Sequence, residues 1–501
     1  MTEDLIAKAL AALRQKDFLT ARTAIAAYAQ DNALELQHFL IKGLSELALA
    51  EWSAAAKTFT DAIEAFPHQP QLWLNLGIAQ ENLGYVDEAA ESFEESIDLK
   101  NNQGDAYGNL SNLYRKQGRF DEAVAMAHLA FEHGAPKAQA LNSLGLAHGK
   151  QGKFEAATRT FNEALQFDPT NADIHANIAN LAIDQLRFND AWPAFSKART
   201  LQDSATLKRD EGMARLLTGD FAKGWPLYEA RLELPTALRT RPPCPIYKGE
   251  MLAGKKLLLV AEQGFGDTIM FCRYGELLAK QGAELLWYVQ KPLQWLLKGN
   301  LPGKLFTEED PLPEADYYLP LLSLPLVTGK LDPWDISSAP YMEVSVSPEL
   351  PQAITGKRKI GLVWTGSPTH ERDHERSIPL GVFAPLFNRK DIQLFAPFTG
   401  AGLEEITSAT PVISLASSIK DFADTAALLK QMECLVTVDT AVAHLAGALG
   451  VKTYLLLPHC PDWRWGTTGE KTPWYNSMTL LRQPSYGDWE SVISTLAEKL
   501  T

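Results

Sequence analysis

One pattern of apolar positions recurs every 34 residues through the first half of the chain. Small residues such as Gly77 and Gly145 stand where two helices would approach closely, and alanines recur at a second close contact. Glycines such as Gly84 suit the turn between two helices, where a positive φ angle favours glycine. One position of the pattern, repeated at intervals of 34 residues, is occupied mostly by apolar side chains: Leu5, Phe39, Trp73, Tyr107, Leu141, His175 and Arg209. The pattern predicts an α-solenoid of about seven helical pairs over residues 1–235, in which each pair is buried against its neighbours.

The pattern changes after residue 235. A proline-rich stretch at 241–245 (RPPCP) suits neither a helix nor a central strand. Beyond it, short apolar runs alternate with amphipathic stretches, which predicts parallel sheets covered by helices on both faces. The expected strands are 256–261, 284–289, 359–364, 392–396, 434–438 and 453–457, and the expected helices are 268–280, 421–430, 440–449 and 489–500.

These elements predict a linker at 236–250 and two Rossmann-like halves at 251–347 and 348–501. Ligands of such sheets bind beyond the carboxyl ends of the strands. The candidate chemistry is therefore sought where strands end.

Composition narrows the class of protein. The 501 residues carry 47 basic and 61 acidic side chains, a net charge of −14, which argues against a nucleic-acid partner. No apolar run reaches 18 residues and the N-terminus is acidic, so neither a membrane span nor a cleaved signal peptide is expected. The four cysteines show no CxxC spacing, which favours reduced thiols in a cytoplasmic protein without a metal cluster.

The first candidate site follows the strand at 256–261. Gly264 and Gly266 leave room for a ligand to approach the backbone, and Asp267 stands at the start of the next helix. Asp267 is either a general base that takes a proton from an attacking hydroxyl, or an N-cap that satisfies free helix N–H groups.

The second candidate site follows the strand at 359–364. Arginines at this point would clamp a diphosphate through two hydrogen bonds each, and serines would add hydroxyl donors. The alternative is a solvated loop of mixed charge. The candidate residues are Gly366, Ser367, Arg372, Arg376 and Ser377.

The third candidate site follows the strand at 434–438. Free N–H groups of Ala441 and Val442 at a helix start favour phosphate, and Thr440 either caps the helix or binds phosphate. Asp439 suits a sugar hydroxyl, and His444 lies one turn further on the same helix face. The alternative is an Asp/Thr cap followed by a hydrogen-bonded core histidine.

Two resemblances are carried by these residues. The 34-residue unit, with Trp73, Leu76, Gly77, Gly84 and Ala89 in its third copy, resembles the tetratricopeptide repeat. The chain from about residue 252 to 501 resembles the heptosyltransferase-like glycosyltransferases (family 9) of the GT-B fold. Its most specific match is residues 439–446 (DTAVAHLA), and residues 264–267 (GFGD) match that family's first glycine-rich loop. Residues 261–264 (AEQG) and 461–465 (PDWRW) are further features similar to bacterial fusions of such repeats with this domain.

The resemblance implies a metal-independent hexosyl- or heptosyltransferase-like enzyme with no cofactor. It would move a sugar from a nucleotide-diphosphate sugar to an acceptor hydroxyl, possibly on a protein docked by the repeats. It implies that Asp267 is the base and that the other candidate residues bind the donor.

Departures from the family are Ala441, where glycine is usual, and arginine in place of a lysine in the middle basic segment. Pro397 also stands in a loop that often presents backbone groups to the nucleobase. Trp463 and Trp465 either line the site or pack the hinge between the halves.

The alternative functions are a catalytically silent scaffold for protein–protein interaction and a sugar-nucleotide epimerase.

Overall fold

The computed structural model describes residues 2–235, 238, 240–344, 348–351 and 356–500. These residues form two compact units, Met1–Leu181 and Ala182–Thr501. Positions 236, 237 and 239 of the predicted linker, and the predicted end of the first half at 347, lie outside the described residues.

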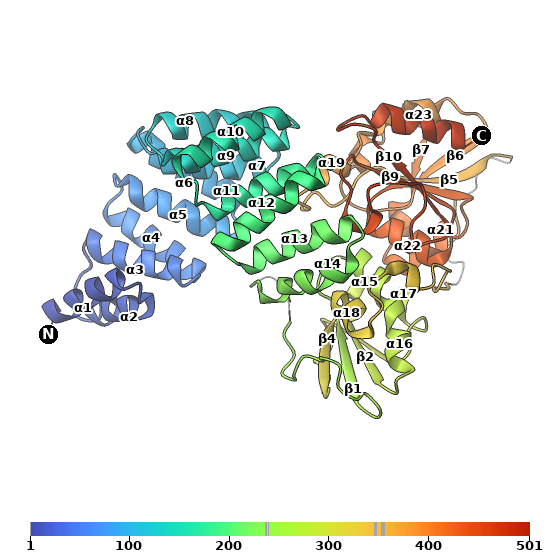
Figure 1. Ribbon diagram of the computed structural model, residues 1–501, viewed down its shortest axis with the longest axis horizontal. Helices are drawn as coiled ribbons and strands as arrows, with labels where there is room; N and C mark the ends of the chain where they lie inside the picture. Colours follow the sequence, from blue (N-terminus) through green and yellow to red (C-terminus); the bar gives the residue numbers. More distant parts are fainter. Residues whose placement is uncertain (1, 236–237, 239, 345–347, 352–355, 501) are drawn as a thin grey trace. The chain divides into compact units, whose positions relative to one another are not determined.

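The N-terminal part of the chain consists of seven antiparallel helical pairs, as predicted (Figure 1). Each pair joins a helix of 13 or 14 residues to a second helix through a short turn. The pairs are α1 Thr2–Arg14 with α2 Phe18–Tyr28, α3 Leu36–Ala48 with α4 Trp52–Ala65, α5 Pro70–Leu83 with α6 Val86–Leu99, α7 Gly104–Lys116 with α8 Phe120–Glu132, α9 Lys137–Lys150 with α10 Phe154–Phe167, α11 Ala172–Asp184 with α12 Phe188–Leu201, and α13 Ala205–Leu217 with α14 Phe221–Tyr228.

The repeated glycines explain how closely the two helices of a pair approach. A Cβ atom on Gly77 would lie 2.6 Å from the Phe93 ring, and one on Gly145 would lie 2.6 Å from the Phe161 ring. Gly84 has a φ of 84°, and the residues 34 positions before and after it share this left-handed conformation. The turn therefore imposes the conformation, which L-residues adopt only at a cost.

The C-terminal part contains two parallel sheets. The first has the strand order β3-β2-β1-β4, and the second has the order β10-β9-β8-β5-β6-β7. The strands are β1 Lys256–Val260, β2 Glu284–Val289, β3 Lys304–Thr307, β4 Tyr317–Pro320, β5 Arg358–Val363, β6 Ile392–Ala396, β7 Val412–Ser414, β8 Cys434–Val438, β9 Thr453–Leu457 and β10 Met478–Arg482. All six predicted strands are confirmed.

The predicted helix at 268–280 is wrong in its start and its continuity. Helix α15 spans Phe265–Phe271, and a 3₁₀ turn at Cys272–Tyr274 separates it from α16 at Gly275–Ala279. The remaining α-helices are α17 Gln294–Leu297, α18 Leu324–Thr328, α19 Asp373–Arg376, α20 Ala384–Phe387, α21 Phe422–Leu429, α22 Ala441–Leu449 and α23 Trp489–Lys499. Of these, α21, α22 and α23 confirm the other three predicted helices.

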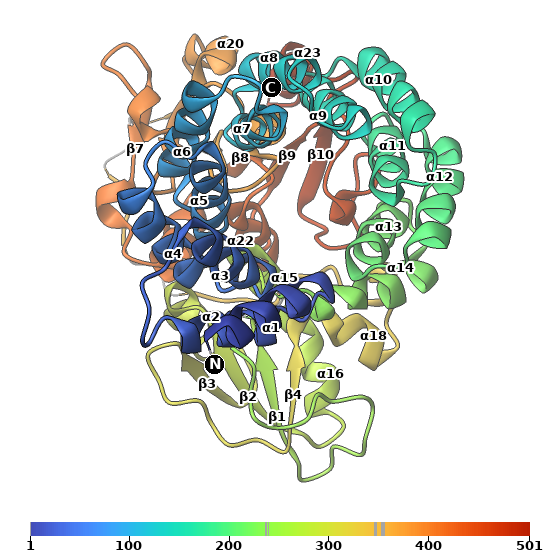
Figure 2. The same cartoon turned by 90° about the vertical axis from the view of Figure 1, so that its left-hand side faces the viewer.

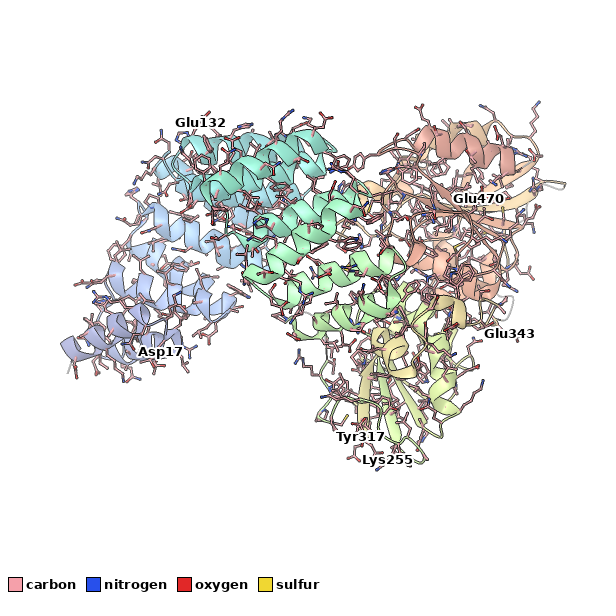
Figure 3. All side chains as sticks on the ribbon, in the orientation of Figure 1. Asp17, Glu132, Lys255, Tyr317, Glu343 and Glu470 are labelled. Carbon is pink, nitrogen blue, oxygen red and sulfur yellow. The ribbon has the colours of Figure 1, made fainter. Side chains whose placement is uncertain are left out.

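In each sheet there is one point from which successive strands are added in opposite directions. This point lies between β1 and β4 in the first sheet and between β5 and β8 in the second. Ligands of open parallel sheets bind beyond the carboxyl ends of the strands at such points. Figures 1 and 2 draw α15 at this end of the first sheet. Lys255 and Tyr317, labelled in Figure 3, mark the opposite, amino-terminal edge. All three candidate segments follow strands that flank these points.

The second compact unit includes the last helical pair as well as both sheets. The indole N–H of Trp225 in α14 donates a hydrogen bond of 2.8 Å to the carbonyl oxygen of Leu331. The Trp225 ring also meets the Trp463 ring edge-on, with centroids 5.3 Å apart. The end of the helical array is thus packed into the sheet-containing unit.

Candidate functional site

The N-terminus of α22 presents free hydrogen-bond donors directly after β8. Thr440 is the N-cap residue, but its side chain makes no capping bond and its hydroxyl lies 3.3 Å from the Thr437 hydroxyl. The backbone N–H groups of Ala441 and Val442 have no acceptor among the described residues. Two N–H groups and the positive end of the helix dipole therefore face the end of β8, an arrangement that favours an anion.

Arg376 connects the ends of the two central strands of the second sheet. Its guanidinium donates hydrogen bonds of 2.9 Å to the backbone oxygen of Asp439 and 3.0 Å to the carboxylate of Asp373. A Cβ atom on Gly366 would lie 2.5 Å from Arg376 Nη2, so glycine leaves the space that the guanidinium fills. Arg376 and Gly366, which the sequence analysis assigns to one candidate site after this strand, thus lie next to each other.

Ser377 orients this junction. The Ser377 hydroxyl donates to the Asp373 carboxylate at 2.9 Å and accepts the Gly366 N–H at 3.0 Å. Since both interactions are internal, its geometry suits the support of the loop. Ser367 is exposed, and its hydroxyl lies 2.8 Å from that of Thr369.

Arg372 has partners that differ from those of Arg376. Its guanidinium pairs with Asp184 at the end of α11, at 3.1 Å, and with Glu375 in its own turn. It also donates to the backbone oxygen of Cys460 at 3.3 Å. Of the two candidate arginines, Arg376 therefore contacts the end of β8, whereas Arg372 joins α11 to the loop after β5.

Asp439 lies between charged neighbours. Burial and, to a smaller extent, the nearby Asp462 carboxylate raise the pKa of the Asp439 carboxyl to about 6, against the opposing effect of Arg376. Burial also opposes ionisation of Asp462, but the guanidinium of Arg464 outweighs it and lowers the pKa of that carboxyl. Of the two acids, Asp439 is the one that changes protonation closer to neutral pH.

Asp267 lies in the first turn of α15 and is not its N-cap. The N-cap is Gly264, whose N–H donates to the Asp267 carboxylate at 3.0 Å. The other carboxylate oxygen pairs with Arg464, which also donates to Asp462 at 2.7 Å. The Asp267 carboxylate is therefore fixed between the loop after β1 and the 3₁₀ turn η9, Trp463–Trp465.

His444 is a packed side chain. It is 5% exposed, its Nδ1 lies 2.9 Å from the Tyr475 hydroxyl, and its ring stacks on Trp465 with centroids 5.2 Å apart. A Cβ atom on Gly266 would lie 2.7 Å from His444 Cδ2, so this glycine allows α15 and α22 to meet. The geometry favours the core-histidine alternative for His444 and a packing role for Gly266. Trp465 and Trp463 are also buried, which favours packing over a place in a ligand wall.

The buried imidazole predicts a pH dependence of stability. Burial lowers the pKa of His444 to about 3, so below pH 6.5 the unfolded state binds a proton that the folded state does not. The contribution of the neutral imidazole to the free energy of unfolding is fully present above pH 6.5. Below that pH it falls by about 1.4 kcal/mol per pH unit. Because the raised pKa of Asp439 acts in the opposite direction below pH 6, a variant is needed to isolate the effect.

His444→Phe is expected to be less stable than the wild type at pH 7, since it removes the hydrogen bond between the imidazole and the Tyr475 hydroxyl. This difference should narrow by about 2 kcal/mol between pH 7 and pH 5, because only the wild type loses stability through the imidazole. Urea unfolding of both proteins at several pH values measures the difference. A constant difference would show that His444 is not buried in its neutral form.

A buried ion pair beside this site was not found from the sequence. Arg231, in the 3₁₀ segment η1 Glu229–Glu233, donates two hydrogen bonds of 2.9 Å to the carboxylate of Glu262. Arg231 is 3% exposed, and the Leu322 N–H also donates to Glu262, at 2.8 Å. The one available signal was the segment 261–264 (AEQG), in which a glutamate comes shortly after the apolar run of β1.

The N-terminal part matches known repeat proteins. A tetratricopeptide-repeat model, described as the Cilia and flagella-associated protein 70 C-terminal domain, matches residues 7–215. A tetratricopeptide repeat protein from Parabacteroides merdae is 16% identical with a TM-score of 0.42, over 47% of this chain and 93% of that one. A thermophilic tetratricopeptide-repeat protein from Thermus thermophilus is 22% identical with a TM-score of 0.34, over 36% and 100% of the two chains. The helical pairs and the family-model match show that residues 7–215 are built of tetratricopeptide repeats, and the C-terminal part contains parallel sheets.

A curated relative extends beyond the repeats. Protein FlbA of Caulobacter vibrioides is 23% identical over 379 residues, which cover 68% of this chain and 63% of that protein. The chain thus spans less than two thirds of that relative's length.

No helix among the described residues is long and apolar enough to cross a membrane. In the same part of the chain, no group of three or more histidine, cysteine, aspartate and glutamate side chains is placed to hold a metal ion.

Proposed function

We propose that residues 251–501 form a GT-B glycosyltransferase of two Rossmann-like halves, which moves a sugar from a nucleotide-diphosphate sugar to an acceptor hydroxyl. The observation that carries the proposal is the placement of candidate groups around the points where strand order reverses. Asp267 follows β1, Arg376 follows β5, and the free N–H groups of Ala441 and Val442 follow β8. The strand order β7-β6-β5-β8-β9-β10 of the second half is that of dinucleotide-binding sheets.

In this mechanism the second half holds the donor. The N-terminus of α22 and the guanidinium of Arg376 stabilise the negative charge that grows on the leaving diphosphate. Asp439, near its protonation midpoint at pH 6, hydrogen-bonds a sugar hydroxyl. The bond from the anomeric carbon to the diphosphate breaks as the bond to the acceptor oxygen forms, and Asp267 takes the acceptor proton.

The repeats suit the delivery of a protein acceptor. Within the first unit, a polar groove of about 540 Å³ lies along α5, α7, α9 and α11. Five of its twelve lining residues carry amide side chains, and amides both donate to and accept from a peptide backbone. The amide-bearing residues are Asn109, Asn112, Gln139, Asn142 and Asn171. An extended segment of a partner protein is the proposed occupant.

A silent scaffold is the second candidate function, and one observation favours it. Both oxygens of the Asp267 carboxylate already have partners, Gly264 N–H and Arg464. A base must release such a partner before it can accept a proton from a substrate.

The test is a screen of UDP-, GDP-, ADP- and CDP-sugars for release of the nucleoside diphosphate by the full chain, with and without protein fractions from the source cell. Release that depends on an added acceptor supports transfer. Binding of a nucleotide sugar without release supports the scaffold, and release of an epimerised sugar nucleotide without an acceptor supports the epimerase.

Gly366→Ala is expected to raise the KM for the donor about tenfold or more, because a Cβ atom at this position displaces the Arg376 guanidinium and charge-assisted hydrogen bonds contribute about 1.5–3 kcal/mol. Gly381→Ala is the matched control, since a Cβ atom there meets nothing within 4 Å. The change is measured by steady-state kinetics with the nucleotide sugar that the screen identifies as the donor. An unchanged KM in Gly366→Ala would remove Arg376 from the donor site.

A further inference from the structure

The last helical pair and the η1 segment that follows it hold the segment that leads to Asp267. Arg231 forms its two-bond ion pair with Glu262, and the Arg231 guanidinium also donates to the Ser323 hydroxyl at 2.9 Å. Glu262 follows β1 and Ser323 follows β4. One arginine therefore joins the ends of β1 and β4, the adjacent strands between which the strand order of the first sheet reverses.

A second contact acts one residue further along the same segment. The side-chain amide of Gln263 donates to the Tyr228 hydroxyl at 2.9 Å. Burial raises the pKa of Tyr228 to about 12, so the phenol stays protonated at neutral pH. The amide of Gln290 holds the Gln263 backbone by donating to its carbonyl oxygen at 2.9 Å.

These contacts end next to the candidate base. Gly264 follows Gln263, and its N–H is the group that binds the Asp267 carboxylate. From the other side, Trp463 packs its ring on Tyr228 with centroids 6.2 Å apart, and its neighbour Arg464 pairs with Asp267. The segments 261–264 and 461–465 thus both contact the last helical pair.

We infer that Tyr228 and Arg231 are positioning residues, which fix the Glu262–Gly264 segment and through it the Asp267 carboxylate. The end of α14 and the η1 segment are then a part of the reaction site, whereas preceding pairs form the groove. The expected effect of these residues on turnover rests on the proposed glycosyltransferase function. Their effect on the order of the Glu262–Gly264 segment does not depend on that function.

Tyr228→Phe in the full chain tests this inference because it removes one hydrogen bond and keeps the aromatic packing. Tyr247→Phe is the matched control: its hydroxyl bonds the Glu250 backbone oxygen at 3.1 Å, and it is similarly buried. Hydrogen exchange of a peptide covering 262–271 is expected to quicken about 2- to 10-fold in Tyr228→Phe, the effect of one hydrogen bond, and to stay unchanged in Tyr247→Phe.

Turnover provides the second measurement. Tyr228→Phe should lower kcat by a similar factor with little change in the KM for the donor, since the base and not the donor site is displaced. Unchanged exchange in 262–271, or faster exchange spread over the whole second unit, would overturn the inference. Faster local exchange in a protein whose wild type shows no transfer with any donor would uphold the positioning and refute the proposed function.

Discussion

Arg231→Met is expected to lower the free energy of unfolding of the second unit by about 3–5 kcal/mol, because it leaves a buried carboxylate without its partner. Burial by itself raises the pKa of Glu262, and the guanidinium of Arg231 opposes that shift. Without the arginine, Glu262 keeps only the Leu322 N–H among its hydrogen-bond donors. Either the carboxylate stays charged in an apolar setting or it takes up a proton, and both outcomes cost stability.

Two further variants identify the cause. Glu262→Gln should cost less than Arg231→Met, because Arg231 keeps an ion pair with Glu229 at 2.9 Å. The double variant Arg231→Met/Glu262→Gln should recover most of the loss, since no fully buried charge is left unpaired; Glu229, which also loses Arg231, has a side chain that is 28% exposed.

Urea unfolding followed by tryptophan fluorescence measures these effects selectively. Of the 12 tryptophans, only Trp52 and Trp73 lie in the first unit. If the double variant were as unstable as Arg231→Met, lost packing and not an unpaired charge would explain the loss.

The periodic part of the fold could be predicted from the sequence almost completely. A fixed 34-residue spacing places each glycine turn and each close helix contact, since these depend on neighbouring repeats alone. The six strands with continuous apolar runs were equally evident. The four strands that were not predicted, β3, β4, β7 and β10, are three to five residues long and each carries exposed or half-buried positions, so they lack that signal.

The candidate site could be predicted only in part. Strand ends were located because each is followed by glycine or a helix start, and this found Asp267, Arg376 and the turn at Thr440. The partners of Asp267 and Glu262 were not predicted, because Arg464 lies 197 residues from the first and Arg231 lies 31 residues from the second. Such pairs follow from the way the two sheets and the last helical pair pack, which no local pattern records.

Asp267→Asn is expected to lower kcat about 10²- to 10⁴-fold with little effect on the KM for the donor, the range for the loss of a general base. Asparagine keeps the shape of the side chain and an oxygen that can accept the Gly264 N–H, so the loop after β1 should keep its conformation. It cannot take the proton of the acceptor hydroxyl.

The role of Arg464 decides how this result is interpreted. Asp462→Asn is the matched control, because Asp462 is the other carboxylate bound to Arg464, at 2.7 Å. It also removes one negative charge, but it leaves the pair between Asp267 and Arg464 in place. If kcat fell equally in both variants, the shared cause would be the release of Arg464 and Asp267 would be a partner that holds this arginine. If only Asp267→Asn lost turnover, the carboxylate itself would be required, and the ion pair would then have to open when the acceptor binds.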